Sequence, residues 1–112
     1  MTGSESWSSA HEQAWQDAIA VLRREGWIAE MTCSAAPVQI EGRLPSGELF
    51  YFRARHRDAT LAVGGDDPSD IPEWERSERY EMASYMPADD GEDIIRRLAS
   101  SFAAGDPTEG VA

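Results

Sequence analysis

Lysine is absent from this chain of 112 residues, and cysteine occurs once, at Cys33. A single thiol excludes an internal disulfide and a cysteine-rich zinc site. No apolar run approaches the ~20 residues that a membrane-spanning helix needs. Residues 1–9 lack the basic and apolar stretches of a secretory signal. Together these absences predict a protein of the reducing cytoplasm that does not enter a membrane.

Basic residues are scarce as well, because ten arginines stand against 21 acidic residues and leave a net charge of −11. Arginine as the only basic residue is typical of a GC-rich bacterial genome. The balance excludes a basic nucleic-acid binder, so no direct contact with nucleic acid is expected. The charge is also uneven: residues 66–93 hold 11 acidic residues and two arginines, a net of −9. One quarter of the chain therefore carries most of the electrostatic field.

The apolar pattern predicts one helix near each end of the chain. The first follows a capping box at residues 9–12 and ends before Gly26. Its apolar residues recur with the period of one buried helical face: Trp15, Ala18, Ile19 and Leu22. The second helix has acidic residues at its start and Gly105 after its end. Its apolar stripe consists of Ile94, Ile95, Leu98, Ala99 and Phe102.

Strands are expected between the helices, over residues 27–33, 38–44, 49–57 and 60–63. The segments alternate apolar and polar residues and are separated by turn residues. A turn at 45–47 pairs Ile40 with Phe52, and a turn at 57–58, or a loop over 56–59, pairs Phe52 with Val63. Both connections place the same apolar residues on one face, which favours an antiparallel meander.

These elements predict an α+β fold of two layers, in the order α-β-β-β-β-α, with a mostly antiparallel sheet packed on two amphipathic helices. The folded domain is expected over residues 9–103, between mobile tails at 1–8 and 104–112. Residues 66–86 are interpreted as an irregular acidic segment. A helical turn over 73–79 and an edge strand over 80–86 remain alternatives within it.

The acidic segment suggests a function, namely a protein-binding module that docks on a basic surface. Such a partner would be a nuclease, a toxin or a nucleic-acid-binding groove, and the role would be that of an inhibitor, an immunity protein or an anti-defence protein that mimics nucleic acid. The alternative is that the acids provide only solubility and helix capping. The candidate contact residues are Asp66, Asp67, Asp70, Glu73, Trp74, Glu75, Glu78 and Glu81. Trp74 has a second interpretation, in which it folds back over the sheet.

The polar face of the sheet suggests a second function, that of a structural or subunit protein that forms a homodimer. Arginine and tyrosine are common interface residues. The candidates on this face are Arg43, Tyr51, Arg53 and Arg55. The plain alternative is a solvated face, since antiparallel sheets normally show one polar side to water.

No catalytic, metal or cofactor pattern stands out, and a non-enzymatic protein without a cofactor is expected. His56 is expected to be a partly buried structural residue, and Cys33 a small core or edge residue, since no activating group accompanies it. Residues 65–70 cluster oxygen-bearing side chains but lack the pattern of a calcium loop, so no metal site is predicted.

Overall fold

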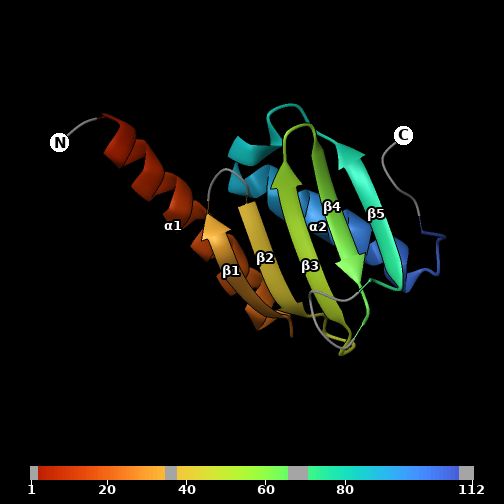
Figure 1. Ribbon diagram of the computed structural model, residues 1–112. Helices are drawn as coiled ribbons and strands as arrows, with labels where there is room; N and C mark the ends of the chain where they lie inside the picture. The colour runs from red at the N-terminus through yellow and green to blue at the C-terminus, as the bar shows by residue number, and fades with distance from the viewer. Residues whose placement is uncertain (1–2, 35–37, 66–70, 109–112) are drawn as a thin grey trace.

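Five strands form one antiparallel sheet in the order β1-β2-β3-β4-β5 (Figure 1). The computed structural model describes residues 3–34, 38–65 and 71–108. The strands are β1 (Ile28–Ser34), β2 (Val38–Arg43), β3 (Leu49–Arg55), β4 (Asp58–Val63) and β5 (Trp74–Arg79). Helix α1 (Gly3–Arg24) precedes them, and a 3-10 turn, η1 (Ala83–Tyr85), and helix α2 (Ala88–Ala103) follow. The predicted α+β class is confirmed, with a fifth strand inside the segment that the sequence left irregular.

Both helices cover the same face of the sheet (Figure 1). The side chains between the layers form a single apolar core. Its largest fully buried members are Trp15, Phe50, Phe52, Ile19, Leu22, Ile40, Leu61, Met86, Ile95, Val38 and Val63. The apolar faces predicted for the two helices and the central strands lie in this core. The opposite face of the sheet, called the open face below, is covered by none of the described elements.

The register of the central strands is predicted correctly in one hairpin and wrongly in the next. Ile40 pairs with Phe52, as expected, but Phe52 pairs with Leu61 rather than with Val63. The turn consists of His56 and Arg57 rather than of residues 57–58 or 56–59, because His56 adopts a φ of 57°, the positive φ that a tight two-residue hairpin turn requires at its first position. The shift amounts to two residues, so every side chain keeps its predicted face.

Strand β5 alternates in spite of its many charges. Trp74 lies opposite Val63, and Glu78 lies opposite Ala59, so both point to the side of the helices. Glu75 and Ser77 point to the open face, where the Ser77 and Thr60 hydroxyl groups lie 2.7 Å apart. The alternatives that the sequence leaves for this segment are a helical turn over 73–79 and an edge strand over 80–86. The structure has instead a strand over 74–79 and a 3-10 turn over 83–85.

The C-terminal residues lie along the outer edge of β5. The hydroxyl group of Thr108 accepts a hydrogen bond from the Glu75 amide at 2.9 Å and donates one to the Glu75 carbonyl at 2.7 Å. The carbonyl of Asp106 accepts a hydrogen bond from the Trp74 indole at 2.9 Å. Residues 106–108 therefore satisfy backbone groups of an edge strand, although the sequence analysis treated them as part of a mobile tail.

Helix α1 also begins earlier than expected, at Gly3. Ser9 therefore lies inside the helix rather than at its N-cap. Residues 3–8, which the sequence analysis assigned to a tail, form the first turns of α1. This end of α1 projects away from the sheet (Figure 1).

Trp15 connects the two helices. Its indole N–H donates a hydrogen bond to the carbonyl of Met86 at 3.1 Å, just before α2. Its ring lies directly over Gly91, where a Cβ atom would overlap the Cη2 atom of Trp15. Gly91 is therefore required by close packing and not by its backbone conformation.

Replacing Gly91→Ala tests this packing. In an ordinary helix the change stabilises by roughly 0.5–1 kcal/mol. Here we expect the free energy of unfolding to fall by about 1–3 kcal/mol, because the added methyl group overpacks the core. Urea unfolding followed by tryptophan fluorescence measures the difference. Ser100→Ala, at an exposed position of α2, is the control and should change little. A stabilised Gly91→Ala variant would contradict the seating of α2 on Trp15.

Candidate interaction surfaces

The predicted acidic contact residues that the structure describes do not form one patch. Asp66, Asp67 and Asp70 lie outside the described residues. Glu75 points to the open face, and Glu78 points to the side of the helices. Glu73 and Glu81 are exposed beyond the two ends of β5. The alternation of a strand therefore separates acids that are close together in sequence.

Trp74 belongs to the core and not to an exposed surface. It is 7% exposed, and its ring packs edge-on against Phe102 with ring centroids 5.4 Å apart. Together with its hydrogen bond to Asp106, this contact holds the C-terminal residues against β5. Trp74 therefore covers the sheet, as the second interpretation expected. Its prediction as an exposed contact residue is wrong.

An exposed acidic surface does exist where β5 leads into α2. We call it the acidic end and define it by Glu81, Met82, Tyr85, Asp89 and Asp93. Tyr85 and Asp89 line a common hollow beside α1, and Asp93 follows Asp89 by one helical turn. Met82 and Tyr85 are 67% and 50% exposed, although both are large and apolar. The acidic end thus combines carboxylates with two exposed apolar side chains.

The backbone of the acidic end is fixed by hydrogen bonds. The Tyr85 amide donates to the Met82 carbonyl at 3.0 Å, and the Ala83 amide donates to the His56 carbonyl at 2.8 Å. Met82 has a φ of 56°, which is unusual for a residue with a side chain. Tyr80 donates a hydrogen bond to Asp90 at 2.5 Å, and this bond raises the pKa of the Tyr80 hydroxyl. Sequence reasoning missed Met82, whose only signal was an apolar residue next to Glu81.

Arginines on α2 neutralise other acids. Arg96 donates two hydrogen bonds to Glu25, at 2.6 and 2.8 Å, and a third to Glu92 at 3.0 Å. Arg97 binds both carboxylate oxygens of Glu78 at 2.9 Å. These hydrogen bonds raise the pKa of both guanidinium groups, first through Glu25 for Arg96 and through Glu78 for Arg97. Glu78 and Glu92, both within residues 66–93, are therefore engaged inside the molecule.

The open face carries its charges in rows that cross the strands. One row, called the glutamate row, consists of Glu30, Glu41, Tyr51, Ala62 and Glu75, each opposite the next. The adjacent row consists of Gln39, Arg53, Thr60 and Ser77, and the row beyond it of Arg55, Asp58 and Arg79. We call these two rows the arginine rows. A further row, on the other side of the glutamate row, contains Arg43 between Ile28 and Leu49, and Asp58 lies between two arginines, so opposite charges on this face are only partly segregated.

Three of the four predicted residues of this face point outward together from β3, namely Tyr51, Arg53 and Arg55. In the described part of the chain, Arg53 forms no ion pair or side-chain hydrogen bond. Arg43 lies apart, because its Nη1 donates a hydrogen bond to the Gly47 carbonyl at 2.8 Å and braces the turn between β2 and β3. These three side chains of β3 therefore share one outward face, as the sequence predicts.

A polar hollow of about 320 Å³ lies at one end of the open face, with Arg53, Arg55, His56 and Asp58 among its lining residues. His56 is exposed in the hairpin turn, so the expectation of a partly buried residue is wrong. The Arg55 Nε–H donates a hydrogen bond to His56 Nε2 at 3.0 Å, which makes that ring nitrogen an acceptor. Asp58 Oδ1 is buried without a hydrogen-bond partner.

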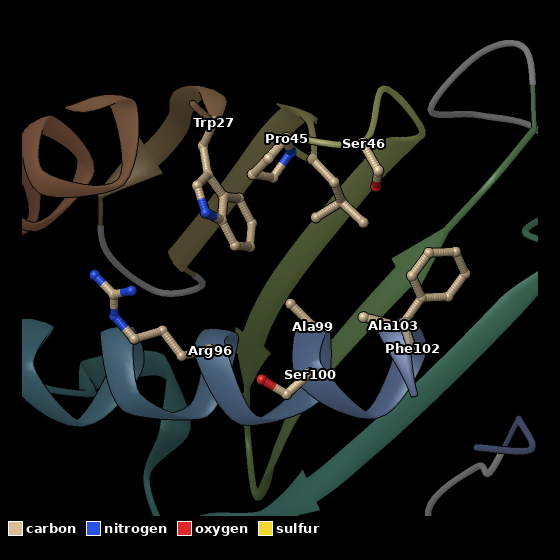
Figure 2. Close-up of a pocket in the computed structure, with 9 residues that line it drawn as sticks. Trp27, Pro45, Ser46, Arg96, Ala99, Ser100, Phe102 and Ala103 are labelled. Atoms are coloured by element: carbon tan, nitrogen blue, oxygen red, sulfur yellow. The ribbon is translucent and has the colours of Figure 1, made fainter. Parts of the chain in front are cut away.

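An apolar groove of about 300 Å³ runs between α2 and the start of the sheet (Figure 2). Trp27 and Pro45 face Ala99 and Phe102 of α2 across it. Arg96 stands at one end, where its charge is already balanced by the two glutamates described above. No sequence signal pointed to this groove, because its two walls come from segments far apart in the chain.

Within residues 3–34, 38–65 and 71–108 no three histidine, cysteine or acidic residues gather as a metal site would require. The calcium-loop residues 66–70 and the side chain of Cys33 lie outside what the structure describes. The described helices include none with the length and apolar character needed to span a bilayer.

The ion pair between Glu25 and Arg96 predicts a pH-dependent stability. Hydrogen bonds from Arg96 hold the pKa of Glu25 below its ordinary value of 4.5. The stabilisation is therefore present above pH 4.5 and is lost as the pH falls through the lowered pKa. We expect Glu25→Gln to lower the melting temperature by a few degrees near neutral pH, and the difference from the unmodified protein to vanish in acid. Circular dichroism melts over a pH series measure it.

Glu12→Gln is the control for this experiment, because it removes one negative charge from an exposed position of α1. Its melting temperature should follow that of the unmodified protein at every pH. Equal melting temperatures of Glu25→Gln and the unmodified protein at neutral pH would contradict a stabilising role for the pair.

Comparisons with known proteins provide no relative for this chain, since no protein-family model, no curated protein and no solved structure matches it.

Proposed function

We propose that this protein is a non-enzymatic binding module of the inhibitor, immunity or anti-defence type, which docks its acidic end on a basic groove of another protein. The observation that supports this most directly is that Tyr85 and Asp89 line one hollow, next along the chain to the exposed Glu81 and Met82. Interfaces commonly place aromatic and methionine side chains at the centre and polar groups around them.

The charge distribution supports a basic partner. The net charge of −11 gives the molecule a negative field at long range. Of the acids in residues 66–93, Glu78 and Glu92 are engaged by arginines of α2, whereas Glu81 and Asp89 are exposed and form no ion pair within the described residues. Asp93 is exposed beside Arg97, whose pKa is raised first by Glu78 and further by the charge of Asp93. A cationic groove would therefore be attracted to the acidic end from a distance, which increases the rate of association at low salt.

The location of the acidic end also suits docking. It is formed by a short turn that leaves the edge of the sheet, and its backbone is held by the hydrogen bonds of η1 and of His56. A fixed backbone lowers the entropy that binding would cost. Met82 combines a left-handed backbone conformation with a side chain that is 67% exposed, and such strained residues concentrate at functional sites. In a nucleic-acid-binding groove the carboxylates would occupy the places of phosphates.

The test compares two variants of equal charge. Glu81→Gln with Asp89→Asn removes two charges from the acidic end, and Glu12→Gln with Asp17→Asn removes two exposed charges from α1. Both are titrated by calorimetry into candidate basic proteins, namely any nuclease or toxin whose gene neighbours this one, at about 0.05 M and about 0.3 M salt. We expect Kd to increase at least tenfold (about 1.4 kcal/mol) for the first variant and less than threefold for the second.

Two further measurements make the outcome decisive. A synthetic oligo-arginine peptide should bind both variants equally, since it senses only net charge. Affinity for the basic protein should weaken at the higher salt concentration. Equal loss of affinity in the two variants, affinity independent of salt, or no binding to any of these proteins would each count against docking by the acidic end.

A further inference from the structure

The open face presents complementary charges to itself. Its glutamate row and its arginine rows are adjacent and run in the same direction across the strands. None of the ion pairs within the described residues joins a glutamate of one row to an arginine of the next. These charges are therefore available to a partner, and any partner that satisfies both rows must itself carry adjacent rows of opposite charge.

We infer that the open face binds a second copy of this chain, face to face, in a symmetric dimer. The two-fold axis lies between the two sheets, parallel to them and perpendicular to the strands. Rotation about this axis places the open face of one copy on the open face of the second copy, with each strand over its own equivalent. If the axis passes between the glutamate row and the nearer arginine row, each glutamate row lies over an arginine row of the second copy. Such an isologous contact uses the same residues twice.

This arrangement specifies individual contacts near the axis. Tyr51 of one copy lies over Arg53 of the second copy, at a position where a guanidinium stacks on an aromatic ring. Glu41 lies one strand spacing, ~4.8 Å, from the same guanidinium, within reach of an arginine side chain. Tyr51 and Arg53 lie on the same strand and the dimer is symmetric. Each of these contacts therefore occurs twice in the dimer.

The charge pattern favours a second copy over another protein. A uniformly basic surface would be repelled by Arg53, Arg55 and Arg79, and a uniformly acidic one by Glu41 and Glu75. Five strands at ~4.8 Å spacing, each contributing about six residues of ~3.3 Å, give a face of roughly 20 Å by 20 Å. The two copies would together bury roughly 800 Å², below the ~1,200 Å² of a standard specific interface, and we therefore expect a weak dimer with a Kd in the micromolar range.

Net charge opposes this dimer but does not prevent it. Two copies at −11 repel each other over long distances. At about 0.15 M salt the Debye length is ~8 Å, so that repulsion is screened while charges in direct contact still attract. The face also includes none of the residues of the acidic end, and the dimer is therefore tested independently of the proposed function.

The experiment is sedimentation equilibrium from about 1 to about 500 μM at about 0.15 M salt. The unmodified protein should dimerise. Glu41→Arg should increase Kd at least tenfold, although it makes the net charge less negative and would strengthen a dimer governed by net charge alone. Arg53→Glu should increase Kd similarly, and the double variant, Glu41→Arg with Arg53→Glu, should return Kd to within threefold of the original.

Asp17→Arg on α1 changes the net charge by the same amount as Glu41→Arg and is the matched control, with Kd unchanged or lower. Circular dichroism confirms that each variant is folded, as expected for exposed positions in the centre of a sheet. A monomer at every concentration overturns the proposal. So does a dimer that Glu41→Arg and Arg53→Glu leave intact, or a double variant that remains monomeric.

Discussion

The constraint on which this structure depends is that a sheet has two faces, and the helices that the structure describes cover only one of them. The most deeply buried side chains of the central strands point to the helices, including Phe50, Phe52 and Leu61, each at most 2% exposed. Strict alternation then requires the residues between them to face solvent. The open face is therefore determined by the same pattern that builds the core, and its charges are necessarily arranged in rows, since antiparallel pairing aligns successive strands.

Trp15 connects this core to the acidic end. Its indole hydrogen bond to Met86 and its contact with Gly91 hold the start of α2 against α1. The turn that carries Met82 and Tyr85 ends at Met86, so the position of these exposed residues depends on the packing of a buried ring. The feature proposed for binding is therefore part of the rigid domain, in contrast to the irregular segment that composition alone suggested.

The parts that the sequence predicts are those determined by local pattern. The apolar stripes of both helices and the register between β2 and β3 needed only alternation and a turn with proline and glycine. Strand β5 could not be predicted, because its support is distant in sequence: Trp74 contacts Asp106 and Phe102, and Glu78 contacts Arg97. The register between β3 and β4 differs by two residues from the predicted one, because the turn begins at His56, whose φ is positive. Of the acidic end, Glu81 was among the predicted contact residues and Met82 was not.

In this chain, acids that are close in sequence are separated onto two faces where the chain forms a strand. They can share one side of the molecule where the chain forms a turn or a helix. In β5 the alternation sends Glu75 to one side and Glu78 to the other, and Arg97 neutralises the latter. Beyond Arg79 the chain turns, and in α2 a spacing of four residues places Asp89 and Asp93 on the same side of the helix. Apart from Glu73, the exposed acids that the structure describes within residues 66–93 therefore lie in the turn and in α2: Glu81, Asp89, Asp90 and Asp93. Met82 and Tyr85, two of the four exposed large apolar side chains of the described chain, lie in the same turn, and this coincidence, rather than the charge count, is the basis for proposing a docking surface.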